Sequence, residues 1–140
     1  MTNTEKIEYI LKELIEKENL SAISDFFTPN YLVHTSKKDY RGHTCIKNYR
    51  GHTCIKKWVK ELNNFLYDLR VVKIEFLNQN DSNVTWKRSI RGKIKPGKNK
   101  NLKEGKVLKW TEMIVSTFEN GKISEEWTVS EFHGELFKNF

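Results

Sequence analysis

Two runs of alternating apolar and polar residues, on either side of Asn-Gly at 120–121, organise the second half of the chain. Asn-Gly between such runs predicts a β-hairpin, because a two-residue type I′ turn needs positive φ at both positions. With Glu119 opposite Lys122, uninterrupted pairing places Trp110 opposite Glu131. One face of the hairpin then collects the apolar side chains of Leu108, Trp110, Ile114, Phe118, Ile123, Trp127 and Val129.

Acidic residues interrupt this apolar face. Glu125 lies near the turn, where solvent reaches it, whereas Glu112 and Glu131 lie among the apolar side chains. A slip of one residue would send the whole set to the other side of the sheet, so this assignment depends on the pairing. A carboxylate held on an apolar face is a candidate functional group.

Amphipathic helices precede the strands. Apolar residues recur at helical spacing over about 5–17, after a capping box of Thr2 and Glu5. A short second helix follows over about 21–27, and a short extended piece covers 31–34. The third helix begins near Thr53 and carries an apolar stripe of Ile55, Trp58, Val59, Leu62, Phe65 and Leu66.

A nine-residue segment occurs twice in tandem. Residues 40–48 read YRGHTCIKN and residues 49–57 read YRGHTCIKK. Nine residues rotate a helix by about 900°, so in one continuous helix Ile46 would point away from Ile55. The second copy therefore leads into the third helix, and the first copy is predicted to be a loop or a separate turn of helix. We interpret the first copy as an insertion that a loop tolerates.

Two further strands lie between the third helix and the hairpin. Residues 69–77 are predicted to place Val72, Ile74 and Phe76 on one face. Residues 84–94 alternate cleanly and place Arg88 on an apolar face. Helices gathered before four long strands predict an α+β domain, in which three N-terminal helices pack on a four-stranded, mostly antiparallel sheet.

Composition limits the classes of partner. The 140 residues are enough for one domain over 1–140, and the net charge is +7. The densest lysine cluster, over 93–106, has no interleaved aromatic residues for base stacking, so we expect no nucleic-acid partner. No apolar run approaches the roughly 18 residues of a membrane helix, and the charged N-terminus does not resemble a signal peptide. We therefore expect no membrane association and a cytoplasmic location.

The cysteines and histidines do not form a ligand pattern. Cys45 and Cys54 occupy the same place in the two copies of the repeat, which predicts neither a disulfide framework nor a metal site. No histidine and carboxylate spacing is typical of a metal site, and no glycine-rich phosphate loop is present. We expect no metal and no cofactor.

Short motifs along most of the chain, from about 20 to 137, carry a family resemblance. They are Val33-His34, Tyr-Arg-Gly before the third helix, DLRV at 68–71, VTWKR at 84–88, EGKV at 104–107 and NGKISEEW at 120–127. In this order and spacing they resemble the SnoaL-like polyketide cyclases of the nuclear-transport-factor-2-like superfamily.

The resemblance implies a cone of curved sheet around a pocket, which helices close, usually in a homodimer. It also implies ring closure by intramolecular aldol condensation without a cofactor, with an acidic residue near the end of the last strand as acid/base. Glu131 matches that position, where family members usually have aspartate. Residues 91–95 replace a Gly-Thr-His-x-Gly-like stretch of the family, which removes a histidine.

The candidate catalytic residues are Glu131, Arg88 and His34. A carboxylate in an apolar pocket suits proton abstraction next to a carbonyl, and Arg88 could stabilise an enolate or bind a carboxylate. Each residue also has an ordinary alternative. Glu131 could be exposed or paired with a lysine, and Arg88 could be a buried structural partner of Glu112. His34 could be a hydrogen-bonded surface or core group.

The candidate ligand-binding residues are Trp58, Trp86, Trp110, Glu112 and Trp127. The tryptophans could stack on a small apolar or aromatic ligand, although core packing is the alternative for at least two of them. Apolar side chains on the other face of the hairpin, together with the resemblance, predict a homodimer.

Two classes of function remain open. The first is a cofactor-independent enzyme of cyclase, isomerase or lyase type, in which Glu131 is the base and Arg88 and His34 assist the oxyanion of a small apolar carbonyl compound. The second is a non-catalytic small-ligand-binding or dimerisation module of the same fold. A cavity that reaches the inward acids would favour the first class.

Overall fold

A computed structural model describes residues 1–38, 44–97 and 103–130 of the chain. In these residues the helices and strands follow the order α1 (Asn3–Lys17), the short 3-10 helix η1 (Leu20–Ala22), α2 (Ile23–Phe26), β1 (Phe27–Lys38), β2 (Thr44–Arg50), α3 (His52–Phe65), β3 (Leu66–Gln79), β4 (Asn83–Ile94), β5 (Val107–Glu119) and β6 (Lys122–Ser130).

The strands form one six-stranded sheet in the order β2-β1-β6-β5-β4-β3. β1 runs parallel to β6, and every other neighbouring pair is antiparallel. The predicted α+β class is confirmed, but the predicted number of four strands is wrong. The piece expected at 31–34 is part of the longer β1, and β2 was not predicted at all. Both strands are rich in polar residues, so they lack the apolar alternation on which the other four were predicted.

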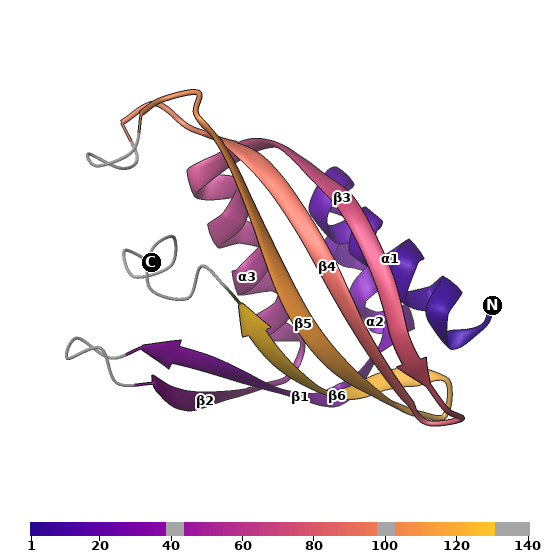
Figure 1. Cartoon of the computed structure of the whole chain (residues 1–140). Helices are drawn as coiled ribbons and strands as arrows, with labels where there is room; N and C mark the ends of the chain where they lie inside the picture. Colours follow the sequence, from indigo (N-terminus) through magenta and orange to yellow (C-terminus); the bar gives the residue numbers. More distant parts are fainter. Residues whose placement is uncertain (39–43, 98–102, 131–140) are drawn as a thin grey trace.

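The sheet is long and strongly curved, and α1, α2 and α3 lie on one side of it (Figure 1). We call the helix-covered side the inner face and the opposite side the outer face. In β4 and β5, alternate residues are buried on the inner face, as the sequence predicted. In the described part of the chain, no helix is both long enough and apolar enough to span a membrane.

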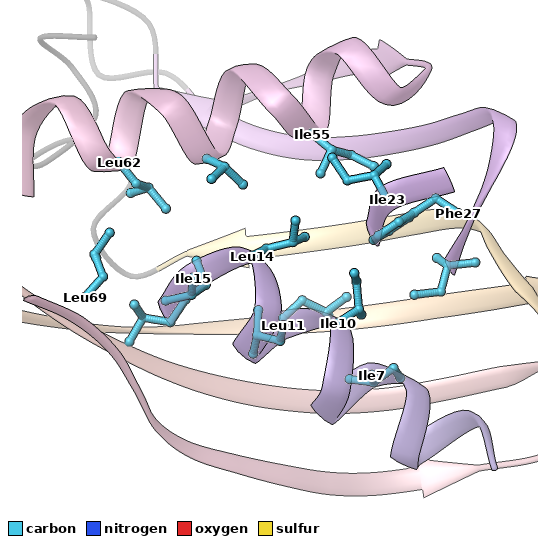
Figure 2. Close-up of a cluster of buried hydrophobic side chains, with 14 of the residues drawn as sticks. Ile7, Ile10, Leu11, Leu14, Ile15, Ile23, Phe27, Ile55, Leu62 and Leu69 are labelled. Atoms are coloured by element: carbon cyan, nitrogen blue, oxygen red, sulfur yellow. The ribbon is translucent and has the colours of Figure 1, made fainter. Parts of the chain in front are cut away.

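Helix α1 provides much of the core on the inner face. The predicted capping box is confirmed: Thr2 Oγ1 accepts a hydrogen bond from the Glu5 amide, and Glu5 Oε1 accepts one from the Thr2 amide. Burial of each large aliphatic side chain contributes about 1.5–3 kcal/mol to folding. Figure 2 shows these side chains between α1, α3 and the sheet, among them Ile7, Ile10, Leu11, Leu14, Ile15, Ile55 and Leu62.

The two copies of the repeat adopt different structures. The second copy leads into α3, as predicted. The prediction for the first copy is wrong where the structure describes it, because Thr44–Asn48 form most of β2 and pair with β1. Residues 39–43 lie outside the described residues. Thr-Cys-Ile-Lys is therefore a strand at 44–47 and a helix at 53–56.

Tertiary contacts explain this difference between the copies. Ile55 is 6% exposed, because α3 directs it into the core, whereas Ile46 is 58% exposed on the edge strand β2. The first copy gains backbone hydrogen bonds to β1 instead of apolar burial. Local sequence alone does not decide the conformation of this segment.

The hairpin of β5 and β6 turns at Asn120 and Gly121, which have φ values of 52° and 78° as a type I′ turn requires. The first two predicted pairs, Glu119–Lys122 and Phe118–Ile123, are confirmed. The ladder then contains a β-bulge, and Thr117 pairs with Glu125, so Ser124 is an extra residue.

The bulge makes the rest of the predicted pairing wrong by one residue. Val115, rather than Ile114, lies opposite Trp127. Trp127 and Val129 are consequently on the outer face, 47% and 61% exposed. Glu125 and Trp127 were predicted to lie on the inner face. Glu126 lies there instead, and it is 7% exposed.

A second bulge, in β3, makes the predicted faces of that strand wrong. Val71 pairs with Ile90 and Lys73 with Ser89, which leaves Val72 as the extra residue. Val72 is exposed, whereas Val71 and Ile74 pack against the core.

Candidate functional site

A cavity of about 360 Å³ lies between α1, α3 and the inner face of the sheet. This is within the usual size range of small-molecule sites. Helix α1 contributes apolar side chains, including Ile7, Ile10 and Leu14, and α3 contributes Cys54, Ile55 and Trp58. Polar side chains of the strands, among them Tyr31, Thr35, Arg88, Glu112 and Glu126, also line the cavity, and α3 adds Lys57 and Glu61.

Strand pairing explains why these polar residues converge. Ser130, Glu112 and Arg88 lie side by side on β6, β5 and β4. Glu126 lies beside Val33 of β1 and Ser116 of β5 in another row on the inner face. Side chains of paired residues share a face of the sheet, so the bulge at Ser124 is what brings Glu126 into the cavity.

Glu126 is buried, and each of its two carboxylate oxygens accepts a hydrogen bond from a hydroxyl group. Tyr31 donates a hydrogen bond from its hydroxyl to Glu126 Oε1 at 2.6 Å, and the Ser116 hydroxyl donates to Oε2. Burial raises the pKa of Glu126 above its ordinary value of 4.5, although Arg88 and the two hydroxyls oppose this shift. A carboxyl group with a raised pKa and a place in a cavity can act as both proton acceptor and proton donor.

Tyr31 and Trp86 extend this hydrogen-bond network. Burial and the neighbouring Glu126 raise the pKa of Tyr31 well above 10, so its hydroxyl keeps its proton and remains a donor. Trp86 Nε1 donates to Ser116 Oγ at 2.9 Å, which leaves the Ser116 hydrogen for Glu126. These contacts fix the Glu126 carboxyl group against one wall of the cavity.

Arg88 and Glu112 form an ion pair on the inner face. Arg88 Nε donates to Glu112 Oε1 at 2.9 Å, and the two side chains are 10% and 8% exposed. The guanidinium carbon lies 4.9 Å from the ring centroid of Trp58 and 5.4 Å from that of Trp86. No described residue accepts a hydrogen bond from the two terminal nitrogens of Arg88. These nitrogens can therefore donate to an oxygen of a bound molecule.

The structure brings four of the sequence-predicted residues to the cavity: Arg88, Glu112, Trp58 and Trp86. Trp110 is completely buried in the core and does not line the cavity. Glu131 lies outside the described residues.

His34 and Trp127 lie together on the outer face, away from the cavity. Their rings stack with centroids 3.9 Å apart, and His34 Nε2 contacts Glu125 Oε2 at 2.6 Å. The prediction that Trp127 shares a face with Trp110 is wrong, because the bulge reverses the faces of β6 beyond Ser124. His34 lies opposite Trp127 in the parallel pairing of β1 and β6, so it follows Trp127 to that face.

Sequence reasoning missed Glu126 and Tyr31. Consecutive Glu125 and Glu126 were a usable signal, because two adjacent strand residues always point to opposite faces, and one acid therefore faces inward in either register. Tyr31 was predicted to be extended, but no pattern indicated which way its ring points. Among the described residues, no group of three or more His, Cys, Asp or Glu side chains is arranged to hold a metal ion.

Comparison with known proteins places this geometry in a family. The model of the SnoaL-like polyketide cyclase family matches residues 6–134. No match was found among curated proteins.

Solved structures share the fold at low sequence identity. A SnoaL-like polyketide cyclase from Agrobacterium tumefaciens is 16% identical, with a TM-score of 0.66 over 94% of this chain and 92% of that chain. IdmH of Streptomyces antibioticus, a proposed polyketide cyclase, is 18% identical, with a TM-score of 0.73 over 94% and 93% of the two chains. A proposed polyketide cyclase from Acidithiobacillus ferrooxidans is 17% identical, with a TM-score of 0.72 over 94% and 89%. These likenesses show an α+β fold of the nuclear-transport-factor-2-like type.

Proposed function

Because the chain belongs to the SnoaL-like polyketide cyclase family, we propose that it is a cofactor-independent acid/base enzyme of cyclase or isomerase type. Its substrate is a small apolar carbonyl compound that binds in the cavity between α1, α3 and the sheet. The observation that carries the proposal is the buried Glu126 carboxyl group on the cavity wall, with its raised pKa.

In this mechanism Glu126 is the base. Its carboxylate takes a proton from the carbon next to the substrate carbonyl, and the electrons of that C–H bond form the enolate. The terminal nitrogens of Arg88 donate hydrogen bonds to the enolate oxygen, where negative charge develops. In a cyclase, the enolate carbon attacks a second carbonyl of the same molecule, and the protonated Glu126 returns the proton to the new alkoxide.

Glu126 replaces Glu131 in the role that the sequence analysis assigned. Glu126 lines the cavity and is hydrogen-bonded by Tyr31, whereas the structure does not describe Glu131. The apolar side chains of α1 lower the local polarity and so favour proton transfer to a carboxylate of raised pKa. The rings of Trp58 and Trp86 both lie close to the Arg88 guanidinium group, which supports a fixed position for its donors.

Proton exchange in heavy water tests this proposal without knowledge of the natural substrate. We expect the protein to speed the exchange of the methyl protons of acetophenone, measured by NMR. The Glu126→Gln variant should lose at least about 100-fold of this acceleration, because the amide keeps the shape of the side chain and lacks its basicity.

Glu125→Gln is the matched control for this experiment. Glu125 is the neighbouring acid, but it contacts His34 away from the cavity, so the variant should exchange protons at the wild-type rate. Unchanged exchange in Glu126→Gln would refute the proposed mechanism.

A non-catalytic ligand-binding module is the second candidate. It is favoured by the observation that Glu126, Glu112 and Arg88 already have protein partners, so the cavity does not need a reaction to satisfy them. In that case the wild-type protein binds aromatic ketones and shows no proton exchange above background.

We also propose that the protein forms a homodimer through the outer face of β5 and β6. Met113 pairs with Val129 and Val115 with Trp127, so apolar side chains of both strands lie together there. Met113, Val129 and Trp127 are exposed. Exposed apolar groups that adjoin one another favour association with a second copy.

A further inference from the structure

Thr35 carries a polar atom in the cavity wall that has no partner. The residue lies on β1, opposite Thr128 of β6, and lines the cavity. Its Oγ1 is sealed from water and makes no hydrogen bond in the described part of the chain. A buried hydroxyl without a partner is unfavourable, and valine has the same shape without this cost. The position therefore keeps a hydroxyl that the folded chain does not use.

A simple rotation can present this hydroxyl to a ligand. Rotation about the Cα–Cβ bond by about 120° between staggered positions can move the hydroxyl to the place of the methyl group, while the methyl group takes the place of the Cβ hydrogen. Because Thr35 already lines the cavity, such a rotation can turn Oγ1 toward the cavity. The hydroxyl then gains a partner when a polar group of the ligand binds.

The charges of the cavity indicate what kind of group this is. Arg88 pairs with Glu112, and Lys57 lies 4.0 Å from Glu61. The remaining acid in the described lining, Glu126, disfavours an anion, so an uncharged group suits this wall better. Thr35 is three strands from Arg88, which corresponds to about 14 Å between their backbones. A ligand that contacts both must be elongated and must carry one oxygen toward each end.

We propose that Thr35 is a specificity-determining residue, whose hydroxyl binds an uncharged hydroxyl or carbonyl group at the end of the ligand remote from Arg88. This inference rests on the proposed function, since it assumes a carbonyl compound in the same cavity. The substrate then carries a second polar group in addition to its reacting carbonyl.

The first measurement uses the protein without ligand. Thr35→Val removes the unpartnered hydroxyl and keeps the shape, so its Tm should rise by about 2–4 °C. Thr111→Val is the matched control, because Thr111 Oγ1 lies 3.0 Å from Ser89 Oγ, away from the cavity, and loses a hydrogen bond on substitution. Its Tm should not rise. A lower Tm for Thr35→Val would show that the hydroxyl has a partner and would overturn the inference.

The second measurement compares acetophenone with para-hydroxyacetophenone, which differ by one hydroxyl group. The wild-type protein should bind the hydroxylated ketone about tenfold more tightly, as one hydrogen bond allows. Thr35→Val should reduce this ratio to about one, whereas Thr35→Ser and Thr111→Val should keep it. Equal binding of the two ketones by the wild type, or an unchanged ratio in Thr35→Val, would overturn the inference.

The two proposals fail in distinguishable ways. Glu126→Gln should keep the preference for the hydroxylated ketone while it loses proton exchange. If Glu126→Gln keeps proton exchange but Thr35→Val loses the preference, the proposed mechanism is wrong and the role of Thr35 stands.

Discussion

The Tyr31 hydroxyl donates a hydrogen bond to Glu126 Oε1 over a distance of 2.6 Å, although the two residues are 95 positions apart in the chain. The parallel pairing of β1 with β6 makes this contact, since Val33 lies opposite Glu126. Because of this hydrogen bond, the orientation of Glu126, the candidate base, depends on the pairing of β1 with β6, the one parallel pair in the described sheet. Stability and chemistry at Glu126 are therefore linked.

The stability of the protein should depend on pH through Glu126. Its folded pKa is raised above 4.5 by burial, so between its unfolded and folded pKa values the folded state binds more protons than the unfolded state. The contribution of Glu126 to stability is then highest below about pH 4.5 and falls as the pH rises through the folded pKa, by about 1.4 kcal/mol for each unit of the shift.

Glu126→Gln separates this effect from those of other acids, because the amide does not titrate. The free energy of unfolding of the wild type minus that of the variant should fall between about pH 4 and pH 8, as measured by urea denaturation. A difference that stays constant over this range would mean that Glu126 has an ordinary pKa.

The Arg88–Glu112 pair should behave as a buried ion pair. Glu112→Leu leaves the guanidinium buried without its counter-charge and should cost about 3–5 kcal/mol of unfolding free energy. The double variant Arg88→Met with Glu112→Leu removes both charges and should be more stable than Glu112→Leu alone. Urea denaturation of the two single variants and the double variant measures the coupling. Additive effects would show that the ion pair does not form.

Sequence patterns predicted the inner face of β4 and β5 correctly, because both strands alternate without interruption. This alone placed Arg88 beside Glu112. The position of Glu126 could not be predicted in the same way, because a bulge adds one residue without changing the local pattern. Ser124 is small and polar, and such a residue fits a regular strand as well as a bulge.

The edge strands were harder to predict for a different reason. β2 is stabilised by backbone hydrogen bonds to β1 and carries an exposed Ile46. Nothing in its side chains distinguishes it from the identical residues that begin α3. Only the residues after Lys57, which supply the apolar stripe of the helix, assign the helix to the second copy.

Deletion of residues 40–48 should leave a folded protein. Leu32 and Val33 keep their partners Arg50 and Tyr49, and the amide of Gly51 keeps its hydrogen bond to the Tyr31 carbonyl. Continuing the same pairing through residues 34–39 closes the hairpin with a two-residue loop, which is a common length. Circular dichroism and a cooperative thermal transition would verify this outcome.

Deletion of residues 49–57 is the matched control. It gives the same sequence as the first deletion except that asparagine replaces lysine before Trp58. The two shortened proteins should therefore have closely similar Tm values. Failure of both to fold would show that the full length of β2 is needed and that the first copy is not a tolerated insertion.

The proposed dimer should depend on Trp127. Trp127→Lys places a charge among Met113, Val115 and Val129 on the outer face and should convert the dimer to a monomer in analytical ultracentrifugation at micromolar concentration. Lys12→Glu, a charge change at an exposed position of α1 on the opposite side of the sheet, is the control and should leave the dimer intact. A wild-type protein that sediments as a monomer at this concentration would contradict the proposal.

Thr-Cys-Ile-Lys forms a strand at 44–47 and a helix at 53–56, and this matters during synthesis of the protein. The ribosome releases the first Thr-Cys-Ile-Lys before the second, and the two are equivalent until Trp58, Val59 and Leu62 have emerged. The nascent chain must therefore leave the choice between β2 and α3 open, and translation of the segment after Lys57 decides it.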